Sequence, residues 1–262
     1  MTTLDDGDRP QAMLHAEVDG RGPRLVLVHG FAQTRDCWGP VGADLVTDHE
    51  VVRVDAPGHG RSSKLHAGLL TGARLIADQG AKATYLGYSM GGRMVLHLAL
   101  SNPELVDGLV VLGAAGGIDD PQARAERRQV DEGMAQRVER EGVATFLDAW
   151  LAQPLFAGLT DEQQFRAERR ENTVEGLAES LRQAGTGAQD PLWSRLSRLE
   201  MPVLVLAGER DEKFSAEAAR LGEAIGANAT VALVPDAGHA AHLEQPDAFL
   251  AILRPWLAAN GL

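Results

Sequence analysis

Six short runs of mostly apolar residues, each followed by a glycine or a turn, constrain the fold of this chain most strongly. Runs of this length and composition are typical of strands buried on both faces of a sheet. They lie at residues 25–28, 51–54, 84–86, 109–112, 203–206 and 230–234. Helical patterns separate them, such as residues 90–100, which end just before Asn102 and Pro103. This alternation predicts an α/β fold with a mostly parallel sheet and helices on both faces.

One region interrupts the alternation. Residues 117–190 contain no strand-like run, but they contain amphipathic helical stretches at 122–140 and 142–151. We therefore expect a sheet-containing core formed by residues 1–116 and 191–262, with residues 117–190 inserted as a helical cap over one end of the sheet.

The charge and cysteine content exclude several functional classes. The 262 residues carry a formal net charge of −12, so neither nucleic acid nor an anionic membrane is an expected partner. A single cysteine, Cys37, allows no internal disulfide and no cysteine-based metal site. The acidic N-terminal segment MTTLDDGDRPQ lacks the apolar stretch of a signal peptide, and the apolar runs are too short to span a membrane. The sequence thus predicts a soluble, cytoplasmic protein of unknown oligomeric state.

A serine flanked by glycines lies between the predicted strand at 84–86 and the predicted helix at 90–100. The segment G-Y-S-M-G at 87–91 matches G-x-S-x-G, a turn whose glycines allow a sharp bend that raises the serine hydroxyl above the sheet edge. The start of the following helix favours negative charge there. Ser89 is therefore a candidate catalytic serine, the alternative being a glycine-rich turn that matches by chance.

A serine hydroxyl is a weak nucleophile and a weak base unless a neighbour takes its proton. With this kind of turn, a carboxylate and then a histidine follow in the chain. The run at 203–206 leads into A-G-E-R-D, which makes Asp211 the expected carboxylate and Glu209 the alternative. The run at 230–234 leads into P-D-A-G-H, which makes His239 the expected base, with His242 close by in the sequence. Three such residues at three successive strand ends predict a Ser-His-Asp triad.

Two further turns follow predicted strands. The first, H-G-F at 29–31, can offer the Phe31 amide to a developing oxyanion, and the Met90 amide after the serine would be the second donor. The second, D-A-P-G-H-G-R-S at 55–62, is interpreted as a structural loop, with no chemical role expected for Asp55 or His59.

Arg93 follows Ser89 by four residues, so the two side chains share one face of the predicted helix. A cation in the first helical turn opposes the helix dipole, at a cost of a few tenths of a kcal/mol. This position favours a role in binding a substrate carboxylate, with an ion pair to an acidic neighbour as the alternative.

Longer segments carry a family resemblance. They are G-Y-S-M-G-G-R at 87–93, A-E-R-R-Q-V-D at 125–131, F-L-D-A-W-L-A-Q-P-L-F at 146–156, G-T-G-x-Q-x-x-L-W at 185–193, G-E-R-D-E-K-F at 208–214 and A-G-H-A-A-H at 237–242. The chain resembles the α/β-hydrolase superfamily over essentially its whole length and, within it, the MenH family of 2-succinyl-6-hydroxy-2,4-cyclohexadiene-1-carboxylate synthases. The resemblance implies an α/β-hydrolase fold with a cap and a lyase that eliminates pyruvate from 2-succinyl-5-enolpyruvyl-6-hydroxy-3-cyclohexene-1-carboxylate. It implies a small carboxylate-bearing substrate and neither a cofactor nor a metal.

The resemblance also implies roles for individual residues. Ser89, Asp211 and His239 would form the triad, with the serine acting as a general base. The substrate would be bound by Tyr88, Arg93, Arg127, Trp150 and Arg170. Arg169 is the alternative to Arg170, which we select because it precedes Asn172 by two residues. Without the resemblance, Arg127 and Arg170 would be read as solvated and Trp150 as a core residue.

Two other functions fit the same residues. A carboxylic-ester or carbon–carbon bond hydrolase would use Ser89 as a nucleophile and would need water to release the product. A catalytically inactive binding protein of the same fold is the second alternative, but it would be expected to have lost part of the triad.

Overall fold

The computed structural model describes residues 13–262, so the expectation of no signal peptide, which concerns the first eleven residues, lies outside the described part. A seven-stranded sheet forms the centre in the order β1-β3-β2-β4-β5-β6-β7. Its strands are β1 (Ala16–Gly20), β2 (Arg24–Val28), β3 (Glu50–Val54), β4 (Ala83–Tyr88), β5 (Val106–Leu112), β6 (Val203–Gly208) and β7 (Ala229–Val234). Strand β1 runs antiparallel to β3, and the other neighbouring strands are parallel.

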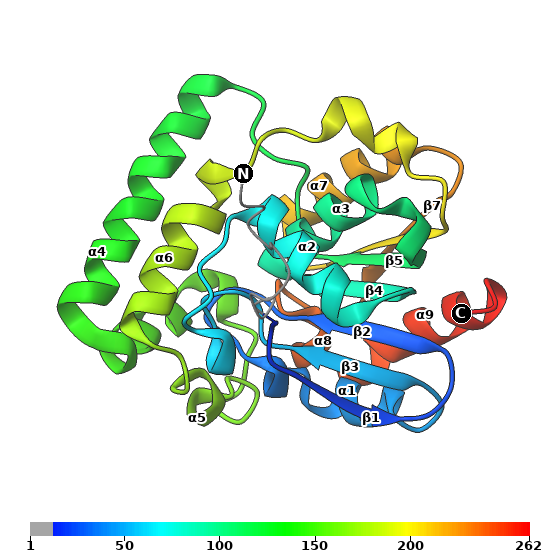
Figure 1. The fold of residues 1–262 in the computed structure, drawn as a ribbon, viewed down its shortest axis with the longest axis horizontal. Helices are drawn as coiled ribbons and strands as arrows, with labels where there is room; N and C mark the ends of the chain where they lie inside the picture. The colour runs from blue at the N-terminus through cyan, green and yellow to red at the C-terminus, as the bar shows by residue number, and fades with distance from the viewer. Residues whose placement is uncertain (1–12) are drawn as a thin grey trace, which may run out of the picture.

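Helices cover both faces of the sheet, as the sequence predicts (Figure 1). One face packs against α2 (Leu69–Gly80), α3 (Met90–Ser101) and α7 (Glu212–Ile225). The other packs against α1 (Gly39–Leu45), α8 (Ala241–Glu244) and α9 (Pro246–Ala259). Alternate residues of the central strands enter the two cores, with Val26 and Val28 on one side and Leu25 and Leu27 on the other. Because both faces of these strands are covered, the side chains on both faces are apolar, and the strands appear in the sequence as continuous apolar runs.

The chain between β5 and β6 is helical. It contains α4 (Pro121–Leu151), α5 (Arg166–Arg169) and α6 (Val174–Ala184), which lie to one side of the sheet in Figure 1. Helix α4 is kinked at Gly142, whose φ of 77° and ψ of 166° are not helical. The kink separates the two helical stretches predicted from the sequence. Ala135, Val138 and Leu177 belong to a small apolar core that packs α4 against α6.

The two outer strands differ from expectation. Strand β1, with the sequence AEVDG, was not predicted, because it lies at the edge of the sheet and shows no apolar run. Strand β7 was predicted as fully buried, but it forms the opposite edge, and Val231 and Leu233 are 42% and 43% exposed. Within residues 13–262, no helix combines the length and the apolar character needed to cross a membrane.

Candidate active site

Ser89 lies at the tight turn between β4 and α3, with φ at 52° and ψ at −107°. This is a strained backbone conformation for a residue with a side chain, of the kind found at functional sites. The flanking glycines make the turn possible. A Cβ atom on Gly87 would lie 2.4 Å from the Gly91 carbonyl oxygen, and one on Gly91 would lie 2.1 Å from that of Val28. The G-x-S-x-G pattern therefore reflects a close approach between helix α3 and strand β2.

The structure brings Ser89, His239 and Asp211 together. Ser89 Oγ lies 3.3 Å from His239 Nε2, and His239 Nδ1 lies 2.8 Å from Asp211 Oδ2. Asp211 Oδ1 accepts a further hydrogen bond from the Phe214 amide at 3.2 Å. Burial alone would raise the pKa of Asp211, but the hydrogen bond and charge of His239 outweigh it and hold that pKa below its ordinary value. A carboxylate at Nδ1 leaves Nε2 free to accept the serine proton.

The two alternatives lie elsewhere. Glu209 is exposed and accepts a hydrogen bond from the Asp236 amide at 3.2 Å. His242 is buried under the site, where its ring centroid lies 4.5 Å from that of Tyr88. Asp211 contacts His239, and His239 contacts Ser89, whereas Glu209 and His242 make neither contact in the described part of the chain.

A turn from residue 30 to residue 35, here called the oxyanion turn, carries Phe31 beside the serine. Ala32 adopts a positive φ of 57° and donates its amide to His59 Nε2 at 3.1 Å. The Gly30 amide is held by Gln33 Oε1 at 2.9 Å. Met90 opens α3, where backbone amides lack partners within the helix. The turn therefore has the rigidity that an oxyanion site requires.

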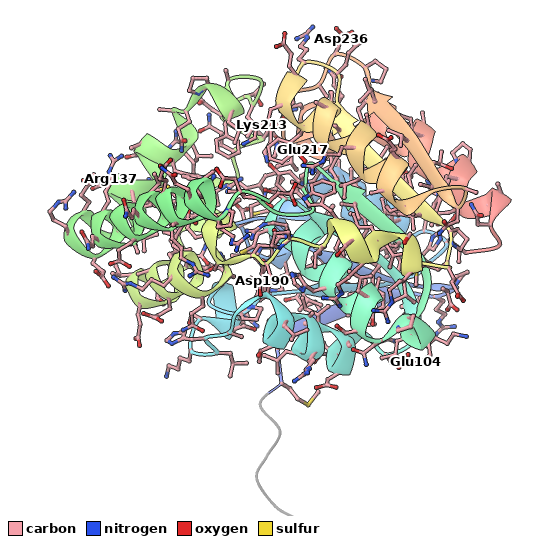
Figure 2. All side chains as sticks on the ribbon, turned by 90° about the horizontal axis from the view of Figure 1, so that it is seen from above. Glu104, Arg137, Asp190, Lys213, Glu217 and Asp236 are labelled. Carbon is pink, nitrogen blue, oxygen red and sulfur yellow. The ribbon has the colours of Figure 1, made fainter. Side chains whose placement is uncertain are left out.

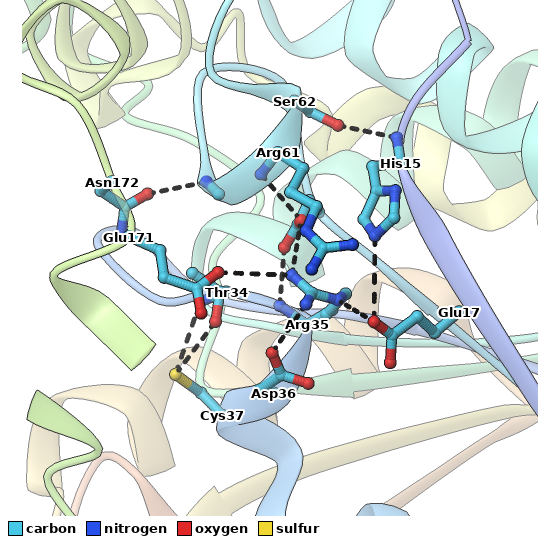
Figure 3. Close-up of polar contacts among 12 residues, drawn as sticks. His15, Glu17, Thr34, Arg35, Asp36, Cys37, Arg61, Ser62, Glu171 and Asn172 are labelled. Atoms are coloured by element: carbon cyan, nitrogen blue, oxygen red, sulfur yellow. Dashed lines mark hydrogen bonds and ion pairs between the residues drawn. The ribbon is translucent and has the colours of Figure 1, made fainter. Parts of the chain in front are cut away.

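Asp55 holds the far end of the oxyanion turn, where Figure 3 shows Arg35 and Arg61 close together. It is fully buried and accepts hydrogen bonds from the Arg35 and Arg61 amides at 2.9 and 3.0 Å. Asn172 reaches this cluster from the cap, accepting from the Gly60 amide at 3.0 Å and donating to the Gln33 carbonyl at 3.3 Å. These contacts are structural, in line with the interpretation of residues 55–62 as a structural loop.

A cavity of about 250 Å³ lies above the triad, between the sheet and the helical insertion. Ser89, His239, Phe31 and Met90 lie in its wall. The predicted substrate-binding residues Tyr88, Arg93, Arg127 and Trp150 also line it, whereas Arg170 does not. The residues predicted from strand ends, from the α3 face and from the cap therefore converge on one space, apart from Arg170.

Arg169, not Arg170, lines the cavity. Arg169 is 1% exposed and donates to the carbonyl groups of Gln164 and Ala32, at 2.7 and 3.1 Å. Arg170, the residue that follows the four-residue helix α5, is exposed. The selection of Arg170 from its spacing to Asn172 is thus not supported by the geometry.

Arg93 is buried in the same cavity, with 8% of its surface exposed. It donates to the Gly185 carbonyl at 3.2 Å, and among residues 13–262 no carboxylate lies within ion-pair distance of it. Burial and the nearby Arg127 charge lower the pKa of Arg93 to about 10, so the group keeps its charge at neutral pH. Burial likewise lowers the pKa of Arg169. The cavity wall thus contains two buried guanidinium groups whose hydrogen bonds, within residues 13–262, all go to backbone carbonyls.

Arg127 is held differently. Its Nε lies 2.8 Å from Asp131 Oδ1, and Asp131 Oδ2 accepts the Gly187 amide at 2.8 Å. Asp131 therefore fixes Arg127 at the cavity wall and ties α4 to the turn after α6. The remaining nitrogens of the Arg127 guanidinium leave it further donors toward the cavity.

Aromatic side chains complete the wall. Trp150 packs edge-on against Phe31, with 5.2 Å between ring centroids, and its buried Nε1 has no hydrogen-bond partner in the described part of the chain. Tyr88 is buried beside His239, with 5.4 Å between centroids, and burial raises the pKa of its hydroxyl.

The polar wall residues that sequence reasoning missed include Gln33, Lys213 and Glu217. Gln33 follows the H-G-F turn, and the other two lie one helical turn apart on α7, directly after Asp211. Their proximity to the motif turns is the signal that could have identified them.

Comparison with known proteins places the chain in a family. The alpha/beta hydrolase family model matches residues 25–252. A 2-succinyl-6-hydroxy-2,4-cyclohexadiene-1-carboxylate synthase of Salmonella heidelberg (strain SL476) is 38% identical over 259 residues, which cover 92% of this chain and 99% of that protein. The chain belongs to this synthase family, within the alpha/beta hydrolases. It is thus an enzyme of the family that the sequence motifs resemble.

Solved structures agree with this assignment. MenH from S. aureus matches this synthase-family chain with a TM-score of 0.87 and 29% identity, over 95% of this chain and 99% of that one. A thermophilic esterase from Thermogutta terrifontis, described with malate bound, matches with a TM-score of 0.78 and 26% identity, over 95% and 94% of the two chains. Because a synthase and an esterase share this architecture, the reaction has to be argued from the site.

Proposed function

We propose that the chain eliminates pyruvate from 2-succinyl-5-enolpyruvyl-6-hydroxy-3-cyclohexene-1-carboxylate, forming 2-succinyl-6-hydroxy-2,4-cyclohexadiene-1-carboxylate. The observation that carries the proposal is the pair of buried guanidinium groups, Arg93 and Arg169, that line the triad cavity and pair with no carboxylate among residues 13–262. A buried cation without a counter-ion is costly, so such groups are expected where a ligand supplies the negative charge. A substrate with several carboxylates supplies it.

The proposed chemistry begins with proton abstraction. His239 Nε2 accepts the Ser89 proton, and Ser89 Oγ removes a proton from the ring carbon that the succinyl ketone acidifies. The amides of Phe31 and Met90 stabilise the oxygen on which negative charge develops. A new carbon–carbon double bond then forms as the carbon–oxygen bond to the enolpyruvyl group breaks. The departing enolpyruvate takes up a proton and becomes pyruvate, so no water is consumed.

The substrate carboxylates are assigned to the cations of the wall. Arg93 approaches from the helix that carries the serine, and Arg127 and Arg169 approach from the cap. Bidentate contacts from guanidinium groups would hold the reacting carbon near Ser89 and lower the barrier through positioning. Tyr88 and Trp150 would pack against the apolar parts of the substrate. Cytoplasmic location, expected from the sequence, stays a prediction.

The experiment is a coupled assay of pyruvate release from the enolpyruvyl substrate. We expect Ser89→Ala to lose about 100-fold or more of kcat, because a positioned base is removed. We expect Arg93→Ala to raise KM by about tenfold or more, because an anion contact is lost. Arg137→Ala serves as the control, since Arg137 lies on the exposed side of α4, where it pairs with Glu141 (Figure 2). Full activity of Arg93→Ala would contradict the anion-binding role.

The hydrolase alternative predicts different results from the same proteins. It is favoured by the similarity to the Thermogutta terrifontis esterase. A hydrolase would turn over p-nitrophenyl acetate with a burst of p-nitrophenol, because an acyl-enzyme on Ser89 accumulates. Rapid ester turnover without pyruvate release would replace the lyase proposal.

A further inference from the structure

Helix α7 contributes an unusual wall to the cavity. Lys213 and Glu217 line the cavity from this helix, and Figure 2 shows both on the side of α7 that faces the cap. The Oε2 atom of Glu217 is buried, and it has no hydrogen-bond partner among residues 13–262. A buried carboxylate oxygen without a donor costs free energy, so this atom requires an explanation.

Lys213 does not supply the missing donor. The two residues are four apart on one helix, where an ion pair is common. However, Lys213 Nζ lies over the Phe214 ring, 5.2 Å from its centroid, and the ion pairs of the described chain include none between Lys213 and Glu217. The glutamate is therefore not held as half of a surface ion pair.

Glu217 also differs from the other carboxylate of the wall. Both oxygens of Asp131 are engaged, one by Arg127 and one by the Gly187 amide. Two other buried polar atoms of the wall lack partners in the part of the chain that the structure describes, and both are donors: Gln33 Nε2 and Trp150 Nε1. Glu217 thus places one acceptor in a cavity otherwise rich in donors.

We propose that Glu217 accepts a hydrogen bond from a hydroxyl group of the substrate and so determines substrate orientation. This inference rests on the proposed function, whose substrate carries one ring hydroxyl together with its carboxylates. The guanidinium groups attract the carboxylates, and Glu217 repels them from the α7 wall. The ring hydroxyl of the substrate can donate a hydrogen bond to the Glu217 carboxylate, so it lies toward α7. Glu217 is therefore a specificity-determining residue of the site.

The test compares two ligands that differ by the elements of water. The proposed product, 2-succinyl-6-hydroxy-2,4-cyclohexadiene-1-carboxylate, carries the hydroxyl, and 2-succinylbenzoate, its dehydrated aromatic counterpart, does not. Inhibition constants for both are measured against pyruvate release in the wild type, Glu217→Gln and Glu217→Ala. Glu223→Gln is the matched control, because Glu223 lies exposed near the end of the same helix.

We expect the preference for the hydroxylated ligand to fall by about 10-fold or more in Glu217→Ala, because a hydrogen bond to a charged acceptor is lost. In Glu217→Gln it should fall by about 3- to 10-fold, because the neutral amide oxygen is a weaker acceptor. The inhibition constant of 2-succinylbenzoate should change by less than about 3-fold in both, since that ligand has no hydroxyl to lose contact with. Glu223→Gln should match the wild type.

The outcomes separate this inference from the proposed function. If the wild type releases no pyruvate, the proposed function itself fails. If the wild type is active but Glu217→Ala weakens both ligands equally, Glu217 supports the fold of the wall and the inference is overturned. If Glu217→Ala fails to fold, the nearly isosteric Glu217→Gln provides the same test. An unchanged ratio between the inhibition constants of the two ligands in that variant also overturns the inference.

Discussion

Arg93 is a residue whose charge opposes folding of the empty protein. Burial lowers its pKa from 12.5 to about 10, which means that the charged form is less favourable in the folded chain than in the unfolded one. The shift corresponds to about 3 kcal/mol at neutral pH. We therefore expect Arg93→Met, which nearly preserves side-chain volume, to raise the free energy of unfolding by about 1–3 kcal/mol while weakening substrate binding by about tenfold or more.

Thermal unfolding checks this expectation. Without ligand, Tm should rise in Arg93→Met by about 2–8 °C. Adding the substrate or product at one fixed concentration should raise the Tm of the wild type more than that of Arg93→Met, because tighter ligand binding stabilises the folded state more. Arg137→Met is the control, since an exposed ion pair contributes about 0–1 kcal/mol. A lower Tm in Arg93→Met would mean that the guanidinium is already satisfied by its contacts in the empty cavity.

Arg169 and Arg170 offer a matched pair of neighbouring arginines. Only Arg169 lines the cavity, so we expect Arg169→Lys to raise KM for the anionic substrate by about 10-fold, because the planar fork of donors is lost while the charge remains. Arg170→Lys should stay within about 2-fold of the wild type, because Arg170 is exposed. Steady-state kinetics of pyruvate release measures both, and the opposite ranking would restore the original selection of Arg170.

At the scale of elements, Asn172 joins the cap to the oxyanion turn. Its side-chain amide donates to the Gln33 and Arg169 carbonyls at 3.3 and 2.8 Å, and its oxygen accepts the Gly60 amide. We expect Asn172→Ala to lower kcat by about 10-fold with KM changed less than about 3-fold, because the turn that carries the Phe31 amide loosens. Steady-state kinetics separates the two constants.

Two variants test whether Asn172 acts through position. Asn172→Asp keeps the acceptor for Gly60 and loses the donor to Gln33, so its kcat should fall between those of the wild type and the alanine variant. The control is Glu171→Gln, because the exposed Glu171 lies 3.6 Å from Arg35 at the edge of the same cluster (Figure 3). A general rise in KM with unchanged kcat in Asn172→Ala would point to a role in substrate binding.

Burial explains which elements could be predicted from the sequence. The central strands were found because the side chains on both of their faces enter apolar cores. The serine turn was found because it requires glycines: a Cβ atom on Gly87 or Gly91 would lie closer than 2.5 Å to a backbone carbonyl oxygen. Strand β1 was missed because an edge strand needs backbone partners and no apolar run. The choice between Arg169 and Arg170 could not be made from the sequence, because a four-residue helix has no periodicity to read. Glu217 was missed because its environment forms only when α7 meets the cap.

At the scale of the whole molecule, buried histidines make stability depend on pH. Burial lowers the pKa of His59 and His242 to about 3 and that of His97 to about 4, and it also lowers the pKa of His29. The unfolded chain therefore binds protons below about pH 6.5 that the folded chain does not bind until about pH 4 or lower. Stability rises with pH wherever the unfolded state binds more protons, so it should fall as pH drops through this window.

The expected loss between pH 7 and pH 5.5 is about 1 kcal/mol for each of His59, His97 and His242, or about 3–4 kcal/mol for the three together. His29 acts in the same direction. The lowered pKa of Asp211 acts in the same direction at lower pH, because its carboxylate is stabilised in the folded state. Urea unfolding at pH 7 and pH 5.5 measures the loss. His97→Gln should reduce this loss of unfolding free energy by about 1 kcal/mol, since the Nε2 atom of His97 is buried without a partner in the described chain. The exposed His66→Gln should leave it unchanged. An equal loss in all three proteins would show that groups other than His97 control the acid response.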